Sequence, residues 1–201
     1  MASELPPGIT HLQPLVEYSA GGSEREWTPF TKIKQYTNAF IIDKQEGKIL
    51  LGYKKRGIGA GYFNGFGGKV EPGETPAEAA SRELQEEAGI DAPLRECGTL
   101  FFHVPGLENA FDIHIFVADE YSGMITETEE MRPQWFSTSA MPPTTQAPGE
   151  PALLPIQYDH MWADDIHWFP LLLANKKFAG RADFADDGKT LMKWWFGSED
   201  S

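Results

Sequence analysis

Runs of apolar residues alternate with polar turns along most of the 201-residue chain. Residues 37–43 and 48–54 are rich in apolar, β-branched and aromatic residues, and a polar turn at residues 44–47 separates them. Two such runs joined by a short turn predict a β-hairpin. Two longer strands are expected at residues 95–104 and 110–119, because the second contains the regular alternation FDIHIFV.

A helix is predicted between Thr75 and Gly89. Thr75 and Glu78 have the spacing of a capping box, and Pro76 stands at the first helical position. Gly89 suits the left-handed residue that ends a helix. A second helix is expected at residues 164–175.

The remaining segments complete the predicted fold. Residues 57–68 hold six glycines and predict an irregular loop or a heavily bulged strand. A short strand is expected at residues 133–137, and two more within residues 177–197. Strands combined with two helices predict an α+β fold. We expect an N-terminal extension at residues 1–35 and one domain at residues 36–197, with a proline-rich loop insertion at residues 142–157.

The formal net charge of −13 disfavours nucleic acid as a partner, because nucleic-acid binding normally needs a basic surface. No apolar run is long enough to span a membrane, and the N-terminus lacks a secretory pattern. Cys97 is the only cysteine, which fits a reducing compartment. We therefore expect a cytoplasmic, monomeric protein that binds neither nucleic acid nor membrane, and leave a nuclear or mitochondrial fraction open.

Three glutamates lie close together on the first predicted helix. Glu83, Glu86 and Glu87 fall within an arc of about 100° on a helical wheel, where like charges repel. An adjacent apolar stripe should pack on a sheet, and it comprises Ala77, Ala80, Leu84 and Ala88. Carboxylates clustered in this way suit Mg²⁺ or Mn²⁺. The alternative is an ordinary glutamate-rich helix surface exposed to water.

The segment GGKVEPGETPAEAASRELQEEAGI, residues 67–90, resembles the Nudix box at every defined position. Those positions are Gly68, Glu74, Arg82, Glu83, Leu84, Glu86, Glu87, Gly89 and Ile90. The resemblance implies a mixed β-sheet sandwiched between α-helices. It also implies hydrolysis of substrates that contain a nucleoside diphosphate linked to another group.

The same resemblance assigns roles around a metal. The implied ligands are Glu83, Glu86, Glu87 and the backbone carbonyl of Gly67. Glu74 and Arg82 would orient these ligands, so Arg82 joins the catalytic set. Without metal, at least one carboxylate should be easier to protonate, because neighbouring like charges raise a carboxyl pKa.

Three further segments are similar to the oxidised purine nucleoside triphosphate hydrolases, the MutT homologues that remove 8-oxo-dGTP and 2-hydroxy-dATP. They are KKRGIGAGYFNGFGGKV (residues 54–70), EMRPQWF (130–136) and MWADDIHWFPLLLANKKFAG (161–180). The implied substrate-binding residues are Asn64, Trp162, Asp164, Asp165, Phe102, Lys54 and Phe111. Glu130 would be a further metal ligand, and it is an alternative to Glu87 as general base.

Particular residues support or qualify this resemblance. Trp162 offers a flat face for stacking on a base. Asp164 and Asp165 would share a proton and thereby offer one donor and one acceptor, although Asp164 alternatively suits a helix N-cap. Ile58 and Val104 stand where the family has phenylalanine, and Phe111 stands where it has methionine. The base pocket should therefore stay apolar but differ in shape.

Together these features predict a Mg²⁺-dependent hydrolase that converts oxidised purine nucleoside triphosphates to the monophosphate and pyrophosphate. Two alternatives stay open at this point. One is a Nudix hydrolase of dinucleoside polyphosphates or nucleotide sugars, and the other is a catalytically silent Nudix-like module that binds nucleotide.

Overall fold

The structure is a computed structural model that describes residues 5–139 and 153–199. The strands of this part of the chain are β1 (Leu15–Gly22), β2 (Lys32–Asp43), β3 (Lys48–Lys54), β4 (Phe63–Asn64), β5 (Ile90–Asp91), β6 (Arg95–His103), β7 (Asn109–Ala118), β8 (Ser122–Gly123), β9 (Met131–Ser137), β10 (Phe178–Phe184) and β11 (Leu191–Glu199). The helices are α1 (Pro76–Ala88), α2 (Asp165–Leu173) and the 3-10 turn η1 (Tyr158–His160). Both α-helices fall short of the length and apolarity that crossing a lipid bilayer requires.

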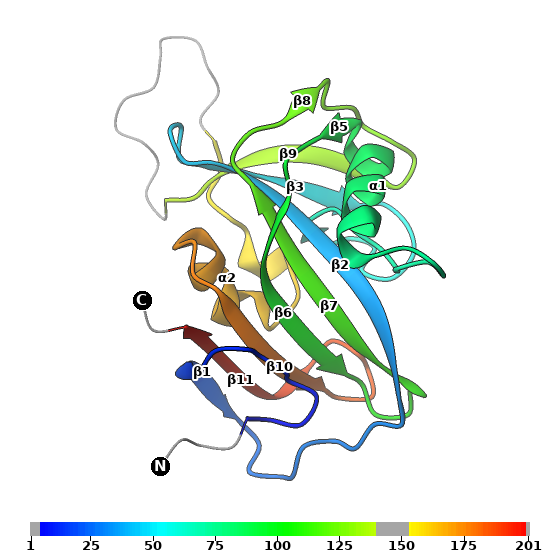
Figure 1. The fold of residues 1–201 in the computed structure, drawn as a ribbon, viewed down its shortest axis with the longest axis vertical. Coiled ribbons are helices and arrows are strands. Elements are labelled where there is room, and N and C mark those ends of the chain that lie inside the picture. The colour runs from blue at the N-terminus through cyan, green and yellow to red at the C-terminus, as the bar shows by residue number, and fades with distance from the viewer. Residues whose placement is uncertain (1–4, 140–152, 200–201) are drawn as a thin grey trace.

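One large twisted sheet organises the molecule (Figure 1). Its strand order is β1-β11-β10-β6-β7-β2-β3-β4, and β9 pairs with β3 on a separate branch. The pairs β2–β7 and β6–β10 are parallel, whereas the other pairs in this sheet are antiparallel. The sheet is therefore mixed, as predicted, and β5 and β8 form a second, small sheet.

The two α-helices cover opposite faces of the large sheet. Successive residues of a strand point to opposite faces. In β2, Phe40 packs in the cluster that contains Trp168 of α2, whereas Ile41 packs in the cluster that contains Leu84 of α1. The predicted sandwich of a mixed sheet between helices is confirmed.

Most predicted elements are confirmed, including the hairpin of β2 and β3. At the start of α1, Glu78 N–H donates to Thr75 Oγ1 (3.3 Å) and Thr75 N–H donates to Glu78 Oε2 (2.8 Å). Gly89 ends the helix with a φ of 73°. The buried face of α1 differs from the predicted stripe, because Ala77 is exposed whereas Ala79 and Glu87 are buried.

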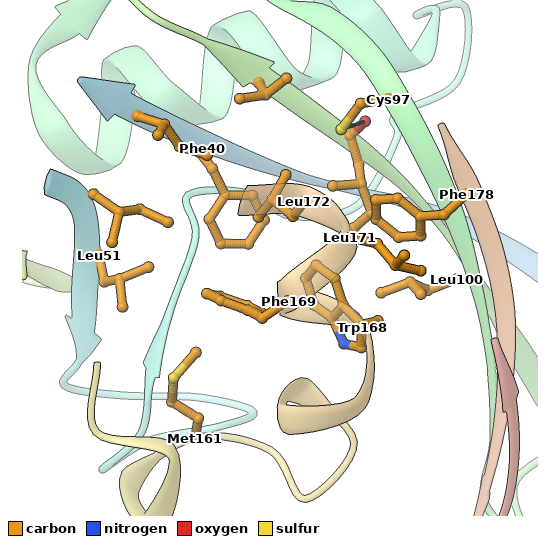
Figure 2. Close-up of a cluster of buried hydrophobic side chains, with 14 of the residues drawn as sticks. Phe40, Leu51, Cys97, Leu100, Met161, Trp168, Phe169, Leu171, Leu172 and Phe178 are labelled. Atoms are coloured by element: carbon orange, nitrogen blue, oxygen red, sulfur yellow. Dashed lines mark hydrogen bonds between the residues drawn. The ribbon is translucent and has the colours of Figure 1, made fainter. Parts of the chain in front are cut away.

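Helix α2 packs on the face of the large sheet opposite to α1 (Figure 2). Its aromatic and aliphatic side chains pack against strand residues Phe40, Leu51, Leu100 and Phe178. The helix ends at Leu173, two residues before the predicted end at residue 175, and Asn175 follows in the left-handed conformation with a φ of 56°.

The N-terminal residues contribute to the same sheet. Strand β1 pairs with β11 along the sheet edge, and the boundary predicted at residue 35 falls inside β2. Arg181 of β10 holds this region, because it donates to the carbonyls of Pro7 (2.7 Å) and Thr28 (2.6 Å). Residues 142–152 of the predicted proline-rich insertion lie outside the described residues, and Pro155 forms a bridge with Ser137 of β9.

Candidate active site

The glycine-rich segment enters the sheet beside β2 and β3. Phe63 and Asn64 pair with β3, and the chain then crosses to β2, where Phe66 and Ala39 exchange two backbone hydrogen bonds of 2.9 and 2.7 Å. Further along, Thr37 N–H donates to the carbonyl of Gly68 (2.8 Å). This path sets Asn64 and the glycines after it between the hairpin and helix α1.

Gly67 and Gly68 allow the loop backbone to lie very close to its neighbours. A Cβ at Gly67 would lie 2.0 Å from the carbonyl oxygen of Thr37, a distance that backbone cannot accommodate. A Cβ at Gly68 would lie 2.4 Å from Glu83 Oε1. The missing side chains therefore bring the loop backbone against β2 on one side and against the glutamates of α1 on the other.

Arg82 gathers the carboxylates at the outer side of α1. Its guanidinium donates to Glu74 through Nε (2.8 Å) and Nη2 (3.1 Å), and through Nη1 to Glu83 (2.8 Å) and Glu86 (3.3 Å). The guanidinium holds the pKa of Glu74 down at about 2. These contacts are consistent with the orienting role predicted for Glu74 and Arg82, and they offset the repulsion between the glutamates.

Glu87 faces inward and is 3% exposed. Its two oxygens accept hydrogen bonds from Lys54 Nζ (2.8 Å) and from Gly67 N–H (2.9 Å). Burial raises the pKa of the Glu87 carboxyl, and Lys54 opposes that rise. The expectation that one carboxylate is easier to protonate without metal is thus met at Glu87, but desolvation is a larger cause than the neighbouring Glu83.

Glu130 approaches from the start of β9. Arg56 Nε donates to it at 3.0 Å, and this partner lowers the pKa of the Glu130 carboxyl. Lys54 Nζ lies 3.8 Å from Glu130 and 2.8 Å from Glu87. A cation therefore already sits between the two carboxylates that the sequence proposes as alternative bases.

The donor set fits a hard divalent cation by its chemistry. Carboxylates of α1, the carboxylate of Glu130 just before β9 and the carbonyl of Gly67 are the kind of oxygen ligands that such cations take. Lys54 and Arg82 occupy positions between the carboxylates, which shows that positive charge is accommodated there. Within residues 5–139 and 153–199, no three His, Cys, Asp or Glu side chains are already grouped to hold a metal. The side chains would have to turn from their cationic partners when a metal binds.

A pocket adjoins these carboxylates. Its lining residues are Lys54, Ile58, Gly59, Asn64, Gly65, Gly67, Met131 and Trp162. Trp162 packs edge-on against Tyr62 (5.3 Å between ring centroids) and against Phe184 (6.3 Å). Phe184 in turn contacts Phe102 at 5.7 Å, so it joins the predicted residues Trp162 and Phe102 in one aromatic group.

Phe111 lies farther along the same surface. It is the cross-strand partner of Phe102 in the β6–β7 ladder, and its ring contacts Tyr36 at 5.2 Å. Phe111 is half-buried and is not among the pocket-lining residues. Its predicted part in substrate binding therefore stays a prediction.

Asp164 and Asp165 are buried at the start of α2, with exposures of 0% and 2%. Trp168 Nε1 donates to Asp164 Oδ2 (3.0 Å), and Trp162 N–H donates to Asp165 Oδ2 (2.9 Å). Burial raises the pKa of Asp164 to about 7, and burial together with Asp164 raises the pKa of Asp165. Asp164 stands at the N-cap position of α2, as the alternative predicted, but its side chain makes no capping hydrogen bond and binds Trp168 instead.

The structure adds partners that the sequence analysis did not identify. Arg56 binds Glu130, Phe184 joins Trp162 to Phe102, and Trp168 binds Asp164. Only the last had a local signal, because residues 164 and 168 are one helical turn apart. Phe184 reaches the group through the pairing of distant strands, which single-sequence periodicity does not reveal.

Comparisons with known proteins agree with this arrangement. The family model described as "NUDIX domain" matches residues 32–156. An "Oxidized purine nucleoside triphosphate hydrolase" of Danio rerio is 47% identical over 145 residues, covering 72% of this chain and 83% of that protein. The protein of the same description in Mus musculus is 43% identical over 157 residues, covering 78% and 90%. A MutT protein from Bacillus halodurans shares the fold at 22% identity, with a TM-score of 0.62 over 82% of this chain and 97% of that one.

Proposed function

The chain belongs to the Nudix family, and we propose that it hydrolyses oxidised purine nucleoside triphosphates to the monophosphate and pyrophosphate. One observation carries the proposal. Lys54 and Gly67, which contact the acidic cluster, line the same pocket as Asn64 and Trp162, which suit a base. A nucleotide can thus place its base and its phosphates at opposite ends of one pocket.

Nudix hydrolases generally need a divalent metal, and we propose Mg²⁺ as that metal here. Its proposed ligands are Glu83, Glu86, Glu87, Glu130 and the carbonyl of Gly67. A divalent metal held there would supply charge neutralisation for the phosphates and activation of a water. Lys54 and Arg56, which bind Glu87 and Glu130 in the structure, are the nearby cationic side chains suited to contact phosphate oxygens.

At the other end of the pocket, Trp162 presents a face on which a purine can stack. Stacking of a base on an aromatic side chain contributes about 1–3 kcal/mol. Asp164 and Asp165, whose pKa values burial raises, are buried next to Trp162 and are not among the pocket-lining residues. Our proposal is that the pair shares one proton and supplies a donor and an acceptor to the base. Exchange of that proton between the two carboxyls would accommodate bases with different hydrogen-bonding edges.

Glu87 and Glu130 remain the two candidates for the residue that takes a proton from the attacking water. A general base works best when its pKa is near the working pH. In the metal-free chain burial raises the pKa of Glu87, whereas Arg56 lowers that of Glu130. Because both are also proposed metal ligands, replacement of each carboxylate, and not its metal-free pKa, distinguishes the two candidates.

A substrate panel tests the proposed function. Purified protein with Mg²⁺ is given 8-oxo-dGTP, 2-hydroxy-dATP, dGTP and a dinucleoside polyphosphate, and pyrophosphate and orthophosphate are measured separately. We expect pyrophosphate release with clear preference for the oxidised purines over dGTP. Equal rates for dGTP and both oxidised purines would contradict the substrate assignment, and a preference for the dinucleoside polyphosphate would replace it.

A further inference from the structure

Asn38 is a polar residue in the apolar run of β2, beside the base end of the pocket. It is 9% exposed, and its neighbours Ala39 and Phe40 are fully buried. Its Oδ1 has no hydrogen-bond partner among the described residues and would lie 2.2 Å from a Cβ at Gly65. The amide fits only because residue 65 has no side chain.

Asn38 binds the side chain of Asn64, one of the residues proposed to contact the base. Asn38 Nδ2 donates to Asn64 Oδ1 at 2.7 Å, and the backbone N–H of Gly65 donates to the same oxygen at 2.9 Å. A backbone N–H can only donate, so the atom of Asn64 that faces Gly65 must be the oxygen. Asn38 must therefore turn its own NH₂ group toward Asn64.

These two bonds determine what Asn64 can offer to a ligand. Its oxygen already accepts two hydrogen bonds, whereas its Nδ2 makes none with the described part of the chain. Asn64 also lines the pocket. The group left for a ligand in the pocket is thus a donor.

A free amide can bind both N6 and N7 of adenine, because it offers an acceptor and a donor together. Guanine instead presents two acceptors, O6 and N7, on that edge. In 8-oxoguanine N7 carries a hydrogen, but O6 remains an acceptor. With its oxygen engaged, Asn64 cannot accept from a 6-amino group but can donate to a 6-oxo group.

We propose that Asn38 is a specificity-determining positioning residue: together with the N–H of Gly65 it occupies the amide oxygen of Asn64, so that the pocket favours 6-oxo over 6-amino purine nucleotides. The inference rests on the proposed function, since it concerns the base of the nucleotide that is hydrolysed. It adds a residue that acts through Asn64 and does not itself touch the base.

The test compares two substrates that differ in the group at C6 and, with it, in whether N1 carries a hydrogen. These are 8-oxo-dGTP and its analogue with an amino group in place of the 6-oxo group, and kcat and KM are measured for wild type, Asn38→Leu and Asn38→Asp. Asn38→Leu should lower the kcat/KM ratio of the 6-oxo to the 6-amino substrate about 5- to 10-fold, mainly through KM, as expected for loss of one hydrogen bond. Asn38→Asp should lower it at least as far, because a carboxylate cannot donate to the Asn64 oxygen and repels it, which leaves that oxygen only the N–H of Gly65 as a partner.

Thr37→Val is the matched control, because Thr37 is a buried neighbour on β2 whose hydroxyl makes no hydrogen bond within the described residues. The kcat/KM ratio of the 6-oxo to the 6-amino substrate should be the same in Thr37→Val as in wild type. An unchanged ratio in both Asn38 variants, or an equal loss for both substrates, overturns the inference.

Measurements of nucleotide binding distinguish failure of this inference from failure of the proposed function. The dissociation constants of the two corresponding monophosphates are measured by calorimetry for the same variants. If wild type releases no pyrophosphate but its base preference still depends on Asn38, the hydrolase proposal fails and the inference stands. If wild type neither turns over nor binds these nucleotides, both are wrong.

Discussion

Glu87 combines burial, charge and contact with the glycine loop in one side chain. Its carboxylate is 3% exposed and lies between Lys54 and the N–H of Gly67. A buried carboxylate needs such partners to stay ionised, because desolvation favours the protonated form of an unpaired carboxyl group. Because one of these partners is the cation of Lys54, a metal ion could take its place beside Glu87.

Replacing this carboxylate tests its role. Glu87→Gln keeps the size and can still accept from Gly67 N–H, so the fold should persist with an unchanged far-UV circular dichroism spectrum. Pyrophosphate release should fall by about 10²–10⁴-fold, the range that general acid–base catalysis contributes. Glu127→Gln is the control, because Glu127 is an exposed carboxylate nearby that pairs with Lys55. Near wild-type turnover in Glu87→Gln would count against both its metal and its base assignment.

Asp164 predicts a pH dependence of stability. Burial raises its pKa from 3.8 to about 7, so between these pH values the unfolded chain loses a proton that the folded chain keeps. The folded state then binds more protons, and the free energy of unfolding falls as pH rises, by up to about 1.4 kcal/mol per pH unit. Its contribution is fully present below pH 3.8 and is lost as the pH passes 7.

Asp164→Asn removes this ionisation and still offers an oxygen to Trp168. Urea unfolding of wild type and variant at intervals from pH 4.5 to 7.5 should give a stability difference that shifts in favour of the variant as pH rises. Contributions from groups that do not interact with Asp164 cancel in the difference, and loss of the Asp164 charge lowers the pKa of Asp165, which shifts the difference in the same direction. A difference that stays constant across this range would show that Asp164 ionises normally in the folded protein.

At the scale of elements, the junction of the glycine loop with α1 links backbone geometry to the acidic cluster. Gly68→Ala would put a Cβ 2.4 Å from Glu83 Oε1, the far end of a flexible side chain. The carboxylate should swing away at little cost in stability, and misplacement of about 1 Å can lower a rate about 10²-fold. We expect kcat to fall at least about 10-fold while the unfolding midpoint in urea stays close to wild type.

Thr75→Ala is the complementary variant, because it weakens the capping box at the start of the same helix. Loss of such a cap costs about 1 kcal/mol of stability. Its kcat should be retained, since Thr75 contacts Glu78 and none of the proposed metal ligands. The opposite pattern, in which kcat falls in Thr75→Ala and is unchanged in Gly68→Ala, would show that the junction does not position Glu83.

Elements with local signals were predictable from the sequence. The capping residues of α1 and the alternation of β7 act over a few positions, so a single chain reveals them. The contact of Asn38 with Asn64 depends on a loop entering between two strands, and no periodicity encodes it. Likewise, β1 had too little apolar content to predict a strand, and its pairing with β11 stabilises it only in the folded sheet.

At the scale of the whole molecule, Arg181 joins the N-terminal segment to the sheet. Its side chain is fully buried, pairs with Asp183 at 2.8 Å and donates to two carbonyls of the N-terminal residues. Its guanidinium also stacks on the ring of Trp27, 4.9 Å from the centroid. Asp183 receives a further hydrogen bond from Thr28 N–H (2.7 Å), so the ion pair and the N-terminal segment stabilise each other.

Arg181→Met tests this connection, because methionine fills much of the space but leaves Asp183 buried without its charged partner. Breaking a buried ion pair on one side costs about 3–5 kcal/mol, and urea unfolding should show a loss of that size. Limited proteolysis should then cut within residues 5–31, which lose their contacts with the guanidinium. Lys193→Met is the control, because Lys193 also lies over Trp27 and donates to the carbonyl of Arg25 but pairs with no buried carboxylate of the described chain. A loss below about 1 kcal/mol in Arg181→Met, equal to that of the control, would mean that the contacts of Arg181 are not what holds the N-terminal segment on the sheet.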